Sequence, residues 1–286
     1  MRIPAITGRK TEKEKFAGAE YTLTIEALMY NGVTLQSGTS HYFGQKFSKA
    51  YDIKFLNRNN EYEYAYQTSW GVSSRMIGAL IMVHSDDDGL VLPPNIAPTQ
   101  ARIVTIGSND EITHLSSDIL NKLTKVGIST DIDNSDQNPG FKFAEAEVMG
   151  IPVRIEIGAR DLEKGLITLA RRDTKQKYQI SKDADIVSEV TKLMQTIQAD
   201  MLARATERRN KMTYEARTLD EFTKIINTTP GFIKADWCGD PNCEAKIKEI
   251  RGTKSRCIAE GAKPLTGKCV VCGRPAKDLV IWGIQY

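Results

Sequence analysis

The sequence has no long apolar run and no apolar segment behind its basic N-terminus. Its longest apolar stretch, "IGALIMV", is far shorter than the ~20 residues that a membrane-spanning helix needs. The start, "MRIPAITGRKTEKEKF", has basic residues without an apolar segment after them, which argues against a secretion signal. These absences predict a globular cytoplasmic protein without a membrane partner.

The sequence also has few cysteines and a small net charge. The 286 residues include five cysteines, an odd number without a secretory context, so a disulfide framework is not expected. A formal net charge of +3 is too small to predict nucleic-acid binding by itself, and no DNA partner is expected. Neither a Walker loop nor a dinucleotide-binding fingerprint occurs, so a nucleotide would need another kind of binding site.

What the sequence does contain is first a β-rich region. The runs "YTLTIEALM", "YDIKF" and "YEYAYQTSW" alternate with period two, and the breaks "YNGV" and "NRNNE" separate them. This pattern predicts an antiparallel sheet joined by hairpins. The stretch "SSRMIGALIMVHS" then predicts a buried helix with Ser73 or Ser74 as its N-cap.

From about Pro98 the pattern changes to alternating strands and helices, which predicts a small α/β domain. The strands are "ARIVTIG", "ISTDI" and "IPVRIEIG". Between the first two, one helical face carries Ile112, Leu115, Ile119, Leu123 and Val126 before Gly127 stops the helix. We expect three domains, 1–97, 98–203 and 204–286, the last containing all five cysteines.

Four cysteines have metal-ligand spacing. Cys238 and Cys243 form C-x4-C, and Cys269 and Cys272 form C-x2-C. Two close pairs can enclose a tetrahedral zinc ion, and a closed four-sulfur site is structural rather than catalytic. The alternatives are a redox pair, which Gly273 after the C-x2-C argues against, and four unrelated buried cysteines. The fifth cysteine is expected in the core.

Long stretches upstream resemble one enzyme family. These are "GRKTEKEKFAGAEYTLTIEAL", "LQSGTSHYFGQKFSKAYDIKF", "YAYQTSWGVSSRMIGALIMVHSDDDGLVLPPNIAP" and "GARDLEKG". Together they resemble prolyl-tRNA synthetase, and the cysteine-bearing C-terminus resembles its archaeal and eukaryotic type. The resemblance implies a dimeric class II synthetase with an antiparallel catalytic sheet. Such an enzyme activates L-proline with ATP and Mg2+ to prolyl-adenylate and transfers proline to tRNA(Pro).

The resemblance also implies site residues. The residues that contact ATP would be Gln36, Thr39, Ser73 and Arg75, and Gln36 would lie near the magnesium ion. Arg75 would be catalytic, because its guanidinium can stabilise the negative charge of the phosphates. The proline pocket would contain Phe16, His41, Trp70 and Gly71. Without the resemblance, His41 is more typical of a turn histidine, Arg75 of an exposed helix charge and Trp70 of the core.

In the middle region, three residues match family positions that contact anticodon bases: Phe143, Glu147 and Arg154. An aromatic ring, a carboxylate and an arginine suit the stacking and edge recognition of single-stranded RNA. Phe143 as core and Glu147 as a solvated helix residue are the alternatives. The basic segments "RDLEKG" and "ARRDTKQK" would add phosphate contacts.

The match begins after the point where class II motifs one and two would end. The chain therefore resembles the C-terminal portion of a synthetase, and we expect an unpaired sheet edge and no useful aminoacylation by the chain alone. Tyr286, at the aromatic terminus, is expected to pack back toward the catalytic region. The alternative functions are a non-catalytic tRNA-binding protein and, less favoured, a zinc-ribbon interaction protein.

Overall fold

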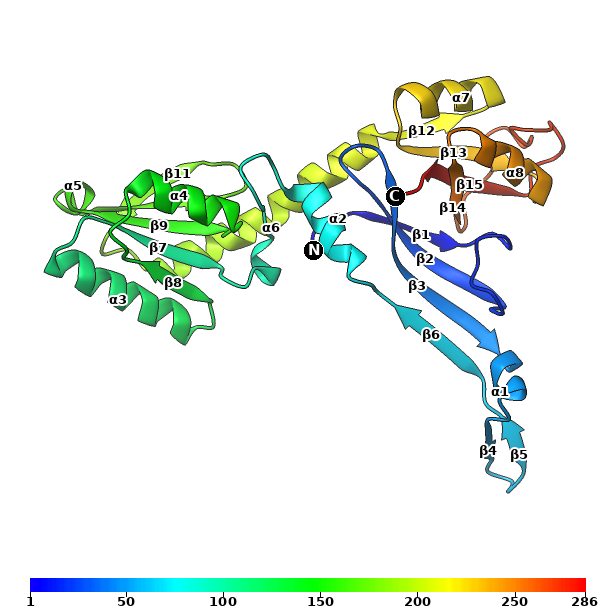
Figure 1. The fold of residues 1–286 in the computed structure, drawn as a ribbon, viewed down its shortest axis with the longest axis horizontal. Coiled ribbons are helices and arrows are strands. Elements are labelled where there is room, and N and C mark those ends of the chain that lie inside the picture. Colours follow the sequence, from blue (N-terminus) through cyan, green and yellow to red (C-terminus); the bar gives the residue numbers. More distant parts are fainter. The chain divides into compact units, whose positions relative to one another are not determined.

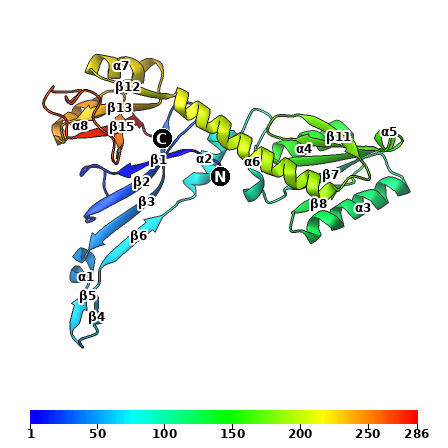
Figure 2. The same cartoon turned by 180° about the vertical axis from the view of Figure 1, so that it is seen from behind.

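The computed structural model describes residues 1–286, which form two compact units. One contains Pro4–Ala79 with Thr206–Tyr286, and the other contains Met1–Ile3 with Leu80–Ala205. Figures 1 and 2 show the elements of both units from opposite sides. No helix is both long and apolar enough to cross a membrane.

An eight-stranded sheet forms the centre of the unit that contains both Pro4–Ala79 and Thr206–Tyr286. Its strand order is β12-β13-β15-β14-β1-β2-β3-β6, and the β12–β13 pair is parallel while the others are antiparallel. The bounds are β1 Ala5–Arg9, β2 Tyr21–Leu28, β3 Thr34–Gly44, β6 Gln67–Gly71, β12 Thr213–Ala216, β13 Phe232–Trp237, β14 Thr253–Ile258 and β15 Asp278–Ile284. The predicted antiparallel sheet near the N-terminus is confirmed.

Both ends of the chain contribute to this one sheet. β1 pairs with β14 through Arg9 and Ile258. Close to the C-terminus, Thr34 Oγ1 donates to the Ile284 carbonyl at 2.7 Å, and the Tyr286 N–H donates to the Thr34 carbonyl at 2.9 Å. The terminus thus returns to strand β3 through backbone hydrogen bonds, while the Tyr286 side chain stays largely exposed. The division into regions 1–97, 98–203 and 204–286 stays a prediction, and the first and last of these regions share a sheet.

Two helices cover the C-terminal part of this sheet. They are α7 Leu219–Thr228 and α8 Pro241–Glu249 (Figure 1). Helix α7 begins where the Thr218 side chain accepts from the Glu221 N–H, a normal N-cap. Its apolar face brings Phe222 edge-on to Trp282 at 6.2 Å between ring centroids. This pair lies within a buried core cluster that also contains Cys243 and Cys269.

Two expectations about the β-rich region are wrong in detail. "YEYAYQTSW" is not one strand, because β5 Tyr62–Tyr64 pairs with β4 Lys54–Leu56 in a separate ribbon, and β6 starts at Gln67. Next to the ribbon lies the short helix α1 Lys46–Ala50. Helix α2 Arg75–His84 is not fully buried, since Ile77 and Ile81 are exposed. Ser73, one of the two expected caps, accepts from the Arg75 N–H at 3.3 Å.

The other unit is the predicted α/β domain. Its sheet has the order β11-β10-β9-β7-β8, with β9, β7 and β8 parallel and β10 and β11 antiparallel. The strands are β7 Ala101–Ile106, β8 Thr130–Asp133, β9 Val153–Gly158, β10 Leu166–Arg171 and β11 Lys177–Ser181. The helices are η1 Pro94–Ile96, α3 Asp110–Lys125, α4 Pro139–Val148, α5 Ala159–Leu162 and α6 Ile186–Lys211.

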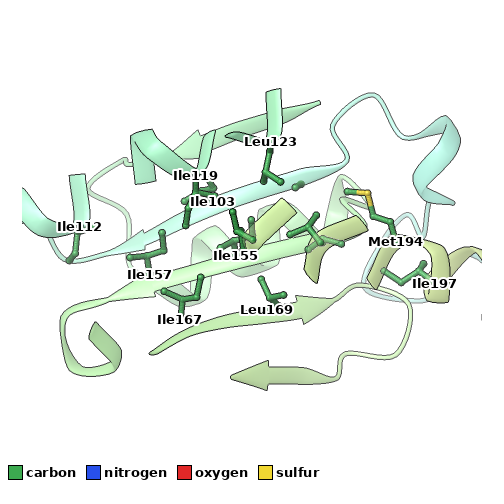
Figure 3. Packing of buried hydrophobic residues seen from close by; sticks show 14 of the residues in the cluster. Ile103, Ile112, Ile119, Leu123, Ile155, Ile157, Ile167, Leu169, Met194 and Ile197 are labelled. Carbon is green, nitrogen blue, oxygen red and sulfur yellow. The ribbon is translucent and has the colours of Figure 1, made fainter. Parts of the chain in front are cut away.

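The core of this unit lies between the sheet and helices α3 and α6 (Figure 3). Ile112, Ile119 and Leu123 of α3 are buried there, as their spacing predicts. Val126 is not, with 55% of its surface exposed. The helix ends at Lys125 because Gly127 adopts a left-handed φ of +83°, so Val126 leaves the predicted helical face.

Candidate functional site

A β-bulge sets the face of strand β3 on which three candidate residues lie. Ile25 pairs with Gly38 but Glu26 pairs with Gln36, which leaves Ser37 as the extra residue. Residues three apart on a regular strand point to opposite faces, whereas one extra residue restores them to the same face. Gln36 therefore lies on the same face of the sheet as Thr39 and His41.

The His41 ring is held between two hydroxyl groups on this face. Its Nδ1 lies 2.9 Å from Thr22 Oγ1 and its Nε2 lies 3.1 Å from Thr39 Oγ1. A hydroxyl can donate or accept, so the two threonines satisfy either neutral tautomer. Burial lowers the pKa of His41 below its ordinary value of 6.5. His41 is thus a hydrogen-bonded histidine, as its alternative expects, but it lies in strand β3 rather than in a turn, and burial favours its neutral form.

Titration of His41 should give a pKa below 6.5 by NMR of its ring carbons and nitrogens. Because the folded state disfavours the protonated ring, its contribution to the free energy of unfolding falls as the pH drops below about 6.5. The same chain unfolded in urea supplies the reference titration. A midpoint in the folded chain equal to or above the unfolded one would contradict the burial argument.

Phe16 reaches this face from the loop between β1 and β2. Its ring lies 4.8 Å from the His41 ring and 5.7 Å from the Phe43 ring, measured between centroids. The Phe16 N–H donates to Thr22 Oγ1 at 3.2 Å, the same hydroxyl that contacts His41. Half of the Phe16 surface remains exposed. The two rings therefore form an open wall on this face.

Trp70 is not gathered with Phe16 and His41, whereas Gly71 lies opposite Thr39 in the β3–β6 pairing. In the β3–β6 pairing, His41 lies opposite Ser69 and Ser40 lies opposite Trp70. Successive residues alternate between faces, so Trp70 points to the other side of the sheet. There Trp70 lines a cavity of about 420 Å3 with Leu23, Ile25 and Val72, which Gly71 and Thr39 also border. Trp70 is 76% exposed, so the alternative that places it in the core is wrong.

Ser73 and Arg75 follow β6 and open helix α2. Both side chains are exposed, which agrees with the alternative that Arg75 is an exposed charge on a helix. Their hydrogen bond at the helix start fixes the backbone from which the Arg75 guanidinium projects. The structure thus leaves this guanidinium accessible to a phosphate group.

Sequence reasoning missed a buried ionic cluster beside the bulge, around Glu26, which pairs with Gln36. Glu26 is 0% exposed, and its carboxylate accepts from Lys10 Nζ at 2.7 Å and from Arg256 Nη2 at 2.6 Å. Arg256 Nε and Thr24 Oγ1 also donate hydrogen bonds to this carboxylate, at 2.9 and 2.7 Å. No local signal identifies it, because Glu26 follows Thr22 and Thr24 on the polar face of β2, and that face is the buried one. Its partner Arg256 in β14 lies 230 residues away.

The three candidate anticodon residues do come together in the α/β unit. Phe143 and Glu147 lie one turn apart on α4, and Arg154 lies on β9. The Arg154 guanidinium stacks on the Phe143 ring at 4.3 Å and contacts Glu147 at 3.2 Å. Glu156, which sequence reasoning missed, binds Arg154 at 3.0 Å.

Lys177 completes this group, with its ammonium 4.7 Å from the Phe143 ring and 2.9 Å from Glu156. Phe143 is half-buried, so it is not simply a core residue. Glu147 is ion-paired, so it is not simply a solvated helix residue. An aromatic ring flanked by two cations and two carboxylates can stack a base and pair with its edge. The alternation of Arg154 and Glu156 on one strand was the signal that could have identified Glu156.

Four cysteines converge as their spacing predicts. Cys238 follows β13, Cys243 lies in the first turn of α8, and Cys269 and Cys272 lie in the turn between β14 and β15. Their sulfur atoms all lie within 4.8 Å of one another, with Cys238 at 3.7 Å from both Cys243 and Cys272. Metal–sulfur bonds of about 2.3 Å in a tetrahedron separate sulfur atoms by about 3.8 Å. The group fits a tetrahedral metal ion and could hold one, whereas a disulfide needs about 2.05 Å.

Surrounding groups prepare this cluster. The buried Asp236 carboxylate accepts from the N–H groups of Leu265, Thr266 and Gly267 at 2.7, 2.7 and 3.0 Å, which fixes the loop before Cys269. Arg274 Nε donates to Cys272 Sγ at 3.2 Å and lowers the pKa of this thiol to about 6, whereas burial raises the pKa of Cys243 to about 12. A thiolate is the form that binds metal.

Cys257 lies apart from the cluster, as expected of a core cysteine. It is fully buried against Leu28, Phe232 and Ile281. Burial, followed by the charge of Glu26, raises the pKa of its thiol to about 12. It is therefore a packing residue and not a fifth ligand.

Two family models match parts of the chain. One, described as "Anticodon binding domain", matches residues 100–193, and the other, described as "Prolyl-tRNA synthetase, C-terminal", matches residues 219–286. The first match includes the group of Phe143, Glu147, Arg154, Glu156 and Lys177, called the Phe143 cluster below. The second match includes all five cysteines.

Curated relatives match the whole chain. Proline–tRNA ligases of Clostridium novyi and Ruminiclostridium cellulolyticum are each 48% identical to it, over 287 and 286 residues, covering 100% of this chain and 60% of the relative. The proline–tRNA ligase of Oceanobacillus iheyensis is also 48% identical over 287 residues, with 59% of the relative covered. The chain thus spans about 60% of the length of these relatives and fits a C-terminal portion.

Proposed function

We infer that the chain belongs to the prolyl-tRNA synthetases, as the C-terminal portion of an enzyme that ligates L-proline to tRNA(Pro) with ATP. The support is 48% identity along its entire length to proline–tRNA ligases, of which it spans 60%. The archaeal and eukaryotic subtype expected from the C-terminus stays a prediction.

The observation that favours a catalytic role most is the bulge that aligns Gln36, Thr39 and His41. We propose that Gln36 and Thr39 contact ATP, with Gln36 near its Mg2+, and that Ser73 and the Arg75 guanidinium contact the phosphates. Adenylate formation builds negative charge on those phosphates, which a preorganised guanidinium stabilises. A helix N-terminus beside Arg75 favours the same charge.

Proline is small and apolar, so its pocket needs shape and apolar surface rather than charge. The Phe16 and His41 rings provide such a wall, and the neutral His41 ring adds no charge to it. Trp70 and Gly71 stay a prediction as further wall residues. An apolar pocket of this kind discriminates weakly against amino acids of similar size.

Three further assignments accompany this function. We propose that Phe143, Glu147 and Arg154 contact anticodon bases of tRNA(Pro), that the four-cysteine group holds a structural Zn2+, and that the full-length enzyme is a homodimer. The zinc assignment is supported by the tetrahedral sulfur spacing. Cytoplasmic localisation stays a prediction.

Proline-dependent ATP–pyrophosphate exchange tests the catalytic proposal. The chain should be measured alone and mixed with the N-terminal 40% of the Clostridium novyi ligase, which completes the relative's length. We expect no exchange by the chain alone and exchange on mixing. In the mixture, Arg75→Ala should lower the rate by roughly 10²- to 10³-fold, as loss of one preorganised donor does. The matched control is Arg58→Ala, another exposed arginine, which should leave the rate unchanged.

A non-catalytic tRNA-binding protein is the second candidate. It is favoured by the Phe143 cluster, whose members all lie within residues 143–177 of this chain. No exchange in the mixture, together with tRNA(Pro) binding that Arg154→Ala weakens, would support this candidate. Exchange by the chain alone would contradict the proposal that the missing 40% is needed.

A further inference from the structure

The loop that carries Phe16 is anchored at its start by two consecutive residues. The Lys10 N–H donates to the Thr22 carbonyl at 2.8 Å, and its ammonium is buried against Glu26 and the Arg256 carbonyl at 2.7 and 2.8 Å. Lys10 is 3% exposed and therefore holds one end of the loop within the sheet.

Thr11 makes the second anchor, to the cysteine-bearing region. Its Oγ1 donates to Glu244 Oε1 at 2.9 Å and lies 3.2 Å from Ser255 Oγ. All three side chains are buried, and Glu244 directly follows Cys243 in helix α8. A cavity of about 290 Å3 borders Thr11, Glu244 and Trp237. Hydrogen bonds between buried side chains therefore link the loop to helix α8 at this junction.

From Thr11 the hydrogen bonds continue to the candidate pocket. The Thr11 carbonyl accepts from the Lys15 N–H at 2.9 Å, which folds the loop into a turn. The next residue, Phe16, donates its N–H to Thr22 Oγ1, and that hydroxyl contacts His41. The ring contact between Phe16 and His41 thus lies one turn away from the Thr11 anchor.

We propose that Thr11 and Glu244 are positioning residues for the Phe16–His41 wall. Neither touches the wall itself; they fix the turn from which Phe16 projects. The proposal rests on the proposed function for its link to proline, but the positioning can be observed without any activity. By this route the helix that supplies Cys243 also determines where the proline-contacting ring lies.

The test compares Thr11→Val with Thr11→Ser. Valine has the shape of threonine without the hydroxyl, whereas serine keeps the hydroxyl, and Glu244 keeps its contact with Ser255 in both. Thr228→Val, at an exposed threonine of α7, is the matched control. Urea unfolding of these three variants and of Glu244→Gln establishes that each is folded before the comparison.

The first readout is the NMR cross-relaxation between the Phe16 and His41 rings, together with the His41 chemical shifts. We expect Thr11→Val to weaken the cross-peaks and shift His41, while Thr11→Ser and Thr228→Val keep both signals as in the parent chain. Glu244→Gln, which weakens the accepting group from the other side, should shift His41 in the same direction. Unchanged cross-peaks and shifts in folded Thr11→Val would overturn the proposal.

The second readout uses the mixture with the N-terminal 40% of the Clostridium novyi ligase. Thr11→Val should raise KM for proline about five- to tenfold, the effect of one hydrogen bond. KM for ATP should stay within twofold, a split that a general loss of stability would not give. If the parent mixture shows no exchange, the proposed function fails while the NMR comparison still decides the positioning.

Discussion

If the four-cysteine group holds the proposed zinc ion, stripping that ion or replacing Cys243 by serine should unfold the core around Trp282. Cys243 and Cys269 belong to the same buried cluster as Trp282, so the ligands are part of this core. Structural zinc sites have apparent binding free energies of about 10–16 kcal/mol in small domains, comparable to the roughly 5–15 kcal/mol that stabilises a whole protein. Near-UV circular dichroism, with metal content measured on the same sample, follows this loss.

Cys257→Ala is the matched control, because it removes a buried cysteine that is not a ligand. It should keep one zinc ion per chain and lower the free energy of unfolding by only about 1–2 kcal/mol. Equimolar zinc in Cys243→Ser, or an unchanged near-UV spectrum after chelation, would contradict the structural role proposed for the cluster.

Glu26→Ala should be the most destabilising single change among the ion pairs. It leaves the Lys10 and Arg256 charges, both almost fully buried, without their common carboxylate. Removing one partner of a buried ionic group costs about 3–5 kcal/mol, because the remaining charge stays desolvated. The midpoint of urea unfolding, with an unchanged slope, measures this cost.

Glu12→Ala is the control for that experiment. Glu12 also pairs with a lysine, Lys15, but its side chain is 70% exposed. An exposed pair contributes about 0–1 kcal/mol, so the control should differ little from the parent chain. If the two variants lose similar free energy, the buried cluster is not the anchor between β2 and β14 that its geometry indicates.

Local patterns in the sequence predicted much of this fold. Alternation with period two predicted β2 and the ladder it forms, and the spacing of Ile112, Ile119 and Leu123 predicted the buried face of α3. The cysteine spacing predicted a cluster that the structure brings together. Each of these signals lies within a short stretch, where the period of the backbone alone decides which side chains meet.

Other features depend on contacts that no local pattern records. The extra residue Ser37 changes the face of Gln36, and nothing in "LQSGTS" distinguishes a bulge from a regular strand. Trp70 was expected with His41, but the register of β6 against β3 places them on opposite faces. The partners Glu26 and Arg256 are 230 residues apart, so their pairing follows from tertiary structure only.

The sheet shared by both ends of the chain also orders events during synthesis. The unit made from residues 80–205 is almost continuous in sequence and can fold as soon as that stretch leaves the ribosome. Strands β1, β2 and β3 are made before residues 80–205, yet Lys10 and Glu26 meet Arg256 only after that unit has been synthesised. Pairings over such separations are slow to form. Strand β1 therefore stays without its partner β14 while residues 80–205 are made and folded.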